Sequence, residues 1–195
     1  MTSVMHGVTD AIERREAIDK VAKPLGRLAG RLDAQEAPSR ILQGVSWLGH
    51  PLHPMLTDLP IGLWTSALAL DAMGERAAPA ADTLVGLGVV ASVPTAAAGL
   101  AEYNRVTKPS TRIATVHAVA NTVALTCMTG SFVARRSGRR GLGRGLALLG
   151  SAALTLGGYL GGHLTYGKGV GVEEEGSAGP PNEPQRGEVV PASGA

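Results

Sequence analysis

Four stretches of the chain are almost free of charge and long enough to form membrane-spanning helices. They cover about residues 55–73, 83–101, 113–134 and 145–162. A helix rises 1.5 Å per residue and needs roughly 20 apolar residues to cross about 30 Å of hydrocarbon. The polar connections between the stretches are short, so neighbouring helices are expected to be antiparallel. We therefore predict an all-α fold, an integral membrane four-helix up-and-down bundle.

The N-terminal segment has a different pattern. From Asp10 to Leu32, apolar residues recur near a 3.6-residue period, while basic and acidic residues share the other positions. This favours an amphipathic helix that lies on the membrane surface or against a partner, with a solvated helix as an equal alternative. Pro24 is expected to kink or divide that helix. Residues 1–9 are expected to be unstructured.

These patterns divide the chain into three parts. Residues 1–40 form the N-terminal amphipathic region, and residues 41–172 form the membrane domain. Residues 173–195 are acidic and rich in proline and glycine, with too little apolar surface to fold alone. We therefore expect a disordered C-terminal tail.

Composition supports the membrane interpretation and narrows the chemistry. Hydrophobic residues make up 44% of the 195 residues and charged residues only 17%, with a net charge of +2. The basic residues are not interleaved with aromatic ones, so nucleic acid is not an expected partner. The single cysteine, Cys127, provides neither a disulfide framework nor a cysteine-based metal site. The N-terminus lacks the pattern of a cleaved signal peptide.

Four of the five histidines fall on one side of the predicted bundle. His50 and His53 precede the first span, His117 lies just over one turn into the third, and His163 ends the fourth. With four crossings, these positions share one membrane face, whichever face is cytoplasmic. Ionisable residues at membrane depth are costly and usually face the bundle interior or water, which makes them functional candidates. We therefore predict that these histidines form a binding site.

Other polar residues on the same side complete the candidate cofactor-binding set: Asp58, Asn121, Tyr159 and Arg112. Carboxylate, amide and phenol groups hold a ring N–H and so fix which imidazole nitrogen is free. Asn121 is suited to this role because it lies one turn from His117 on the same helix face. Arg112 is a candidate partner for carboxylates of a cofactor, and anchoring at lipid headgroups is its alternative role.

The fourth apolar stretch contains two overlapping Gly-x-x-x-Gly patterns. Gly157 pairs with Gly161, and Gly158 pairs with Gly162. Small residues at this spacing let helix backbones approach closely in lipid. The same lack of side chains makes room for a flat cofactor, so both interpretations stay open, with close packing favoured.

Two kinds of cofactor suit the histidine set. A b-type haem needs two neutral imidazoles from different helices, which His117 with His163, or His53 with either, would supply. Alternatively, His50 and His53 bind a zinc or copper ion that is completed by His117, His163 or Asp58. A third alternative is that the histidines only cap and anchor helices. The metal-ligand candidates are His50, His53, His117 and His163.

The motif around the first span resembles a known bacterial family. Gly49-His-Pro-Leu-His-Pro-Met55, followed by Asp58-Leu-Pro-Ile-Gly-Leu-Trp64, is similar to the signature of a membrane-domain family catalogued as domain of unknown function twenty-two thirty-one. Residues 112–121 and 158–172 resemble its third and fourth segments, so the resemblance covers about residues 40–172. It implies a four-span membrane protein. Some members carry a Rieske-type iron–sulfur domain after the bundle, which implies redox work and, for this chain, a Rieske partner in trans.

The sequence thus predicts a multi-pass protein of the cell membrane that binds haem b, or a zinc or copper ion, and exchanges electrons with a redox partner. The expected partners are the lipid bilayer and a Rieske-type or other redox protein, with a homo-oligomer left open. No pair of nucleophile and base stands out. Whether the protein is an enzyme therefore stays open, with electron transfer or binding favoured.

Overall fold

The structure is a computed structural model, and it describes residues 2–170. All secondary structure in this part of the chain is helical. The N-terminal elements are α1 (Thr2–Arg14), the 3-10 turn η1 (Glu16–Ile18), α2 (Asp19–Asp33), α3 (Glu36–Gln43) and α4 (Val45–Leu48). The long elements are α5 (Leu52–Ala72), α6 (Ala78–Tyr103) after the turn η2 (Glu75–Ala77), α7 (Thr111–Arg136), and α8 (Arg140–Gly162), which continues as the π-helix η3 (His163–Gly167). The predicted tail, 173–195, lies outside the described residues.

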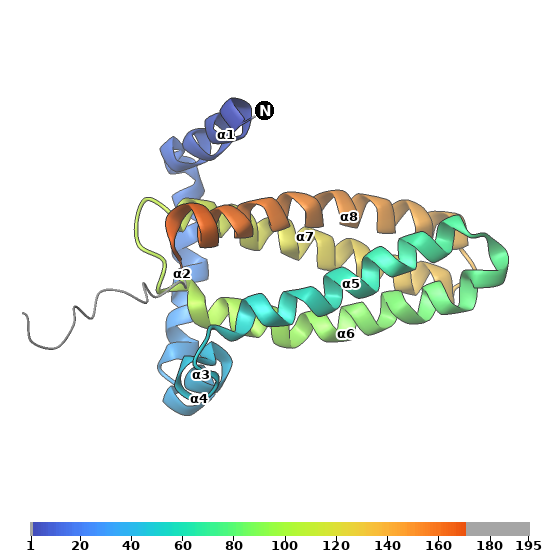
Figure 1. The fold of residues 1–195 in the computed structure, drawn as a ribbon, viewed down its shortest axis with the longest axis horizontal. Helices are drawn as coiled ribbons and strands as arrows, with labels where there is room; N and C mark the ends of the chain where they lie inside the picture. Colours follow the sequence, from blue (N-terminus) through green and yellow to red (C-terminus); the bar gives the residue numbers. More distant parts are fainter. Residues whose placement is uncertain (1, 171–195) are drawn as a thin grey trace, which may run out of the picture.

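The long helices α5, α6, α7 and α8 lie side by side and form the body of the molecule (Figure 1). Three helical segments are long and apolar enough to cross a membrane: Glu75–Tyr103, Thr111–Arg136 and Arg140–Gly167. The prediction of an all-α protein with apolar spans is confirmed at this level. Helix α5 is not among the three, because His53, Asp58 and Asp71 lower its apolar content.

Small residues and glycines dominate the contacts between the long helices. Trp64, Met128 and Ala147 form one buried cluster, against which Leu68, Val89, Leu125 and Leu154 pack. A second cluster, around Tyr103, Ile113 and Leu160, lies toward the end of the body that carries the N-terminal helices. Large apolar side chains elsewhere on these helices point outward, as a lipid-facing surface requires.

Helix α2 crosses the end of the long helices at a steep angle, with α1 and α3 extending beyond them on either side (Figure 1). The expectation of an unstructured segment 1–9 is wrong for the described residues, because α1 begins at Thr2. Thr9 is buried, and Ile12 packs against the Tyr103 cluster, which gives this segment a tertiary partner. The amphipathic region is divided at Arg15, whose backbone is extended, and Pro24 lies within an unbroken α2.

An ion pair fastens this N-terminal layer to the bundle. The guanidinium of Arg112, in the first turn of α7, donates two hydrogen bonds of 2.9 Å to the two carboxylate oxygens of Asp19. It also donates to the carbonyl oxygen of Glu13 at 2.6 Å. The hydrogen bonds from Arg112 hold the pKa of Asp19 below the ordinary carboxyl value. The α1–α2 region is thus fixed to the start of α7.

Candidate functional site

The start of α5 is built to place His53 between helices. Gly44 has φ +78°, and a Cβ there would lie 2.8 Å from the carbonyl oxygen of His50 and 2.8 Å from Leu52 Cβ, so the turn into α5 requires glycine. Pro51 is the N-cap residue of α5. The free backbone N–H of His53 donates to Glu102 Oε1 at 3.2 Å. A carboxylate near a helix N-terminus is stabilised by the helix dipole, so Glu102 caps α5 from α6.

His53 is held against α6. Its Nδ1 lies 2.9 Å from the carbonyl oxygen of Thr95, which can only accept a hydrogen bond, so Nδ1 carries the proton. The ring rests where Gly99 has no side chain: a Cβ at Gly99 would lie 2.8 Å from His53 Cε1. The glycine and the carbonyl, one helical turn apart on α6, therefore fix both the position and the tautomer of this imidazole.

His117 is held against α8 in the same manner. Its Nδ1 donates to the carbonyl oxygen of Gly157 at 2.8 Å, and a Cβ at Gly161 would lie 2.9 Å from His117 Cε1. With the proton on Nδ1, Nε2 of the neutral ring accepts, and Asn121 Nδ2 donates to it at 3.0 Å. Asn121 thus contacts His117 as its spacing suggested, but in a different role: the ring N–H is held by the carbonyl of Gly157, and Asn121 donates to the other nitrogen.

The imidazole rings of His53 and His117 lie next to each other. Their ring centroids are 6.1 Å apart, and the ring planes are nearly perpendicular, at 88°. Both rings donate from Nδ1 to a backbone carbonyl, which leaves Nε2 without a proton on each. A histidine that binds a metal through one nitrogen usually donates its other N–H to such a partner, so both rings have the tautomer of a metal ligand.

The remaining candidates lie apart from this pair. His50 is exposed in the bend before α5, and Asp58 is exposed on α5. His163 begins the π-helix η3, stacks on Tyr159 with ring centroids 6.4 Å apart, and lies against Gly167. Arg112 binds Asp19 of the N-terminal layer. Of the four predicted histidines, the structure therefore brings together His53 and His117.

Within the described residues, no three His, Cys, Asp or Glu side chains gather as a metal-binding group. The pair alone offers two nitrogen donors. A zinc or copper ion usually takes three or four ligands in proteins, whereas the iron of a bis-histidine haem takes two from the protein. The number of donors in the pair therefore matches the second type of site.

A cavity of about 230 Å³ lies at the end of the bundle where α5 begins, and neither histidine of the pair lines it. Its walls include Pro51, Glu102, Arg105 and Lys168. Glu102 also caps the N–H of His53, so the cavity adjoins the start of α5. Arg105 donates to the neutral side chain of Gln43, and Lys168 lies 2.8 Å from Glu13.

Sequence reasoning missed the groups on α6 and α8 that hold the two rings. The acceptors are the main-chain carbonyls of Thr95 and Gly157, and residue identity does not reveal a carbonyl. The Gly157/Gly161 pattern was a usable signal, since both glycines receive side chains of α7. Gly99, which follows Ala96–Ala98, gave the corresponding signal on α6 and could have been paired with His53.

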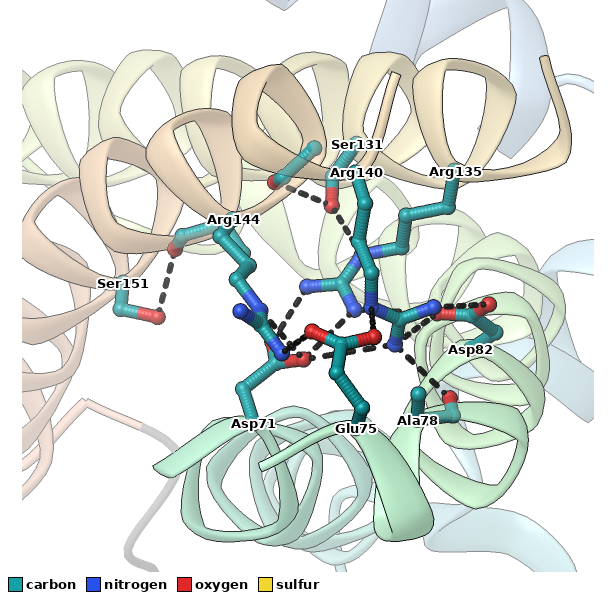
Figure 2. Close-up of polar contacts among 11 residues, drawn as sticks. Asp71, Glu75, Ala78, Asp82, Ser131, Arg135, Arg140, Arg144 and Ser151 are labelled. Atoms are coloured by element: carbon teal, nitrogen blue, oxygen red, sulfur yellow. Dashed lines mark hydrogen bonds and ion pairs between the residues drawn. The ribbon is translucent and has the colours of Figure 1, made fainter. Parts of the chain in front are cut away.

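A second polar cluster lies at the opposite end of the long helices (Figure 2). It consists of Asp71, Glu75, Asp82, Arg135, Arg140 and Arg144. The side chain of Arg135 is fully buried and donates to Asp71 at 2.9 Å and to Asp82 at 3.0 Å. Three arginines face three carboxylates, so each buried charge is compensated. This end of the molecule is an ion-pair network.

Residues 49–174 match a family described as "Predicted membrane protein (DUF2231)", the family that the sequence motif resembles. The match spans more than half of the chain and begins just before α5, so helices α1–α4 lie outside it. Neither the curated proteins nor the solved structures include a match to this chain.

Proposed function

We propose that this chain, which belongs to the DUF2231 family of predicted membrane proteins, binds one redox-active metal cofactor between His53 and His117 and transfers electrons at one membrane face. A b-type haem is the cofactor that we propose first. The observation that carries the proposal is the pairing of two imidazoles with the same fixed tautomer.

The spacing of the rings is compatible with a shared metal ion. A metal–imidazole bond is about 2 Å long, and each nitrogen lies roughly 1 Å from its ring centre, so two imidazoles on opposite sides of one metal would have centroids about 6 Å apart. The centroids of His53 and His117 are 6.1 Å apart. For His117 to bind a metal through Nε2, the hydrogen bond that Asn121 donates to this nitrogen would have to be given up.

In this proposal, residues of α6 and α8 orient the two imidazole ligands. Thr95 and Gly157 keep both Nδ1–H groups engaged, which increases the basicity of Nε2. Gly99 and Gly161 leave the rings close to the backbones of α6 and α8. When bound, haem supplies a one-electron carrier, and two imidazole ligands leave no open iron position for a substrate. Electron transfer is therefore the activity that such a site supports, rather than catalysis on a bound molecule.

We also propose that α5 is a fourth membrane crossing, which makes the protein a four-helix up-and-down bundle. Two of the three polar residues that lower its apolar content face protein: His53 packs on α6, and the side chain of Asp71 is only 9% exposed, whereas Asp58 is exposed near the start of the helix. Its outward face carries the exposed residues Met55 and Leu59. A helix that turns polar groups inward and apolar groups outward suits a lipid-surrounded bundle.

An electron carrier at the membrane needs a partner. A Rieske-type or other redox protein in trans is the partner that we propose, in a multi-pass protein of the cell membrane. A homo-oligomer is compatible with this proposal. The donor and the acceptor would approach the end of the bundle where α2 crosses it, because His53 and His117 lie near that end.

Spectroscopy of the purified protein tests the proposal. The full chain, extracted in mild detergent from haem-replete cells, is expected to show a Soret band and, when reduced, an α band. His53→Ala and His117→Ala are expected to lose these bands, whereas His50→Ala, at an exposed position, is expected to keep them.

Metal analysis of the same preparations separates the alternatives. Wild-type protein without haem but with stoichiometric zinc or copper would support a metal-ion site instead. Colourless, metal-free protein that stays folded after both histidine substitutions would support a purely structural role and overturn the proposal.

A further inference from the structure

The two helical hairpins α5–α6 and α7–α8 hold their histidines in the same way. In each, a histidine near the start of the first helix donates from Nδ1 to a carbonyl of the second, at Thr95 and Gly157. In each, the ring lies against a glycine four residues further on, Gly99 or Gly161. The correspondence extends to the ring atom, since Cε1 is the nearest atom to both glycines.

The same correspondence holds in the middle of the hairpins. Eleven residues after each histidine come Trp64 and Met128, the two large members of one buried cluster. Eleven residues before each glycine come Gly88 and Gly150. Trp64 packs directly on Gly88, whereas a Cβ at Gly150 would meet Cys127 Cβ at 3.1 Å before Met128 Cε at 3.4 Å. Equivalent positions of the two hairpins thus also lie together in the middle of the bundle, one layer further from the histidines.

At the far end, equivalent positions carry opposite charges (Figure 2). Eighteen residues after the histidines stand Asp71 in the first hairpin and Arg135 in the second. Seventeen residues before the glycines stand Asp82 and Arg144. Arg135 binds both acids, and Arg144 lies 3.4 Å from Asp71. The acids of one hairpin therefore meet the arginines of the other.

We propose that α5–α6 and α7–α8 are two structurally equivalent hairpins related by a pseudo-two-fold axis along the helices, and that His53 and His117 form a single ligand site on this axis. Both hairpins begin at the same end of the bundle, so a rotation about that axis relates them. The class of ligand follows: a single metal centre with two equivalent, opposed coordination positions.

The ligand part of this inference rests on the proposed function and sharpens it. If one metal takes both imidazoles as its protein ligands, both histidines are needed for binding, and His163, which lies against Gly167 at the end of α8, is expected to be dispensable. One departure from equivalence is visible four residues after each histidine, where Thr57 stands on α5 and Asn121 stands on α7. Only the His117 side therefore has an amide to displace.

The charges at the far end enforce the pairing of unlike hairpins. Two copies of the first hairpin would place carboxylates at all the equivalent positions, and two copies of the second would place guanidinium groups there. Buried like charges without counterions are strongly unfavourable. Pairing of the first hairpin with the second is the arrangement that neutralises Asp71, Asp82, Arg135 and Arg144.

Two arms of one experiment test the inference on the full chain in detergent. In the ligand arm, haem content and spin state are measured for wild type, His53→Ala, His117→Ala and His163→Ala. We expect one low-spin haem per wild-type chain, the same loss in both members of the pair, and no loss in His163→Ala. Unequal losses, or loss in His163→Ala, would overturn the single shared site, whereas a haem-free wild type would instead remove the haem proposal.

The second arm needs no ligand. Gly99→Ala and Gly161→Ala each place a methyl group against an imidazole and are expected to lower the melting temperature to the same extent. Gly158→Ala is the matched control, because nothing lies within 4 Å of a Cβ there, and we expect no decrease. A decrease in only one of the two, or in neither, would overturn the equivalence of the hairpins whatever the ligand arm shows.

Discussion

The indole of Trp64 lies directly on the backbone of Gly88, and its Nε1–H donates to the carbonyl oxygen of Val85 at 3.3 Å. Trp64 is the more buried of the two tryptophans, with only 3% of its surface exposed. The contact joins α5 to α6 halfway along the bundle.

We expect Gly88→Ala to be destabilising. A Cβ at Gly88 would lie 2.5 Å from Trp64 Cδ1, so the indole must shift and its hydrogen bond to Val85 weakens. Overpacking of this kind costs about 1–3 kcal/mol. Unfolding in detergent measures the loss. Gly62→Ala on α5 is the control, since its Cβ meets open space; equal stability of the two variants would contradict the packing argument.

The ion pair between Asp19 and Arg112 predicts an acid-sensitive N-terminal layer. The pKa of Asp19 is lowered by the hydrogen bonds from Arg112, so its contribution to stability is present above the ordinary carboxyl pKa and is lost as pH falls through the lowered value. We expect Asp19→Asn to lower the melting temperature near neutral pH and to match wild type in strong acid. Melting curves from about pH 7 to about pH 2 follow this convergence.

Asp10→Asn is the control for that series, because Asp10 is exposed on α1 of the same N-terminal layer. Its melting temperature is expected to track wild type at every pH. A gap between Asp19→Asn and wild type that persists unchanged into acid would show that Asp19 stabilises the layer by some means other than its charge.

The buried guanidinium of Arg135 predicts a large effect at the far end of the bundle. Arg135→Gln leaves Asp71 and part of Asp82 without their main counterion, and removing one partner of a buried ion pair costs about 3–5 kcal/mol. Arg139→Gln, at an exposed position in the adjoining turn, is expected to change little. Chemical unfolding in detergent compares them, and similar stabilities would argue against a buried network.

The two tryptophans are expected to report separately on the bundle and on its surface. Trp47 is 59% exposed next to the start of α5, whereas Trp64 is 3% exposed. Iodide is therefore expected to quench the emission of Trp64→Phe, which retains Trp47, much more than that of Trp47→Phe. Quenching of both variants to the same degree would show that the α5–α6 interface opens in detergent.

Periodicity and charge were sufficient to predict the helical architecture. The predicted stretches 83–101, 113–134 and 145–162 lie inside α6, α7 and α8, because a long charge-free segment has few alternatives to a helix. The N-terminal start was missed because Thr9 and Ile12 are fixed by contacts with distant helices. A local pattern carries no information about such contacts.

The sequence was sufficient to predict which side chains belong to the candidate site, but not which main-chain groups hold them. That His53 and His117 share one end of the bundle follows from the alternation of helix direction, and Asn121 follows from helical spacing. His50 and His163 carried the same sequence signal as the pair. What separates them is that His53 and His117 each face a glycine and a carbonyl of the neighbouring helix, whereas His50 is exposed and His163 lies against Gly167 of its own segment.

The ion-pair network also bears on how the chain is made. Asp71 and Asp82 are synthesised well before Arg135, because a whole apolar helix and the loop before α7 come between them. An uncompensated carboxylate is unfavourable in hydrocarbon. The first hairpin therefore emerges from the ribosome electrostatically incomplete, and its acids gain their buried counterion only when the end of α7 arrives.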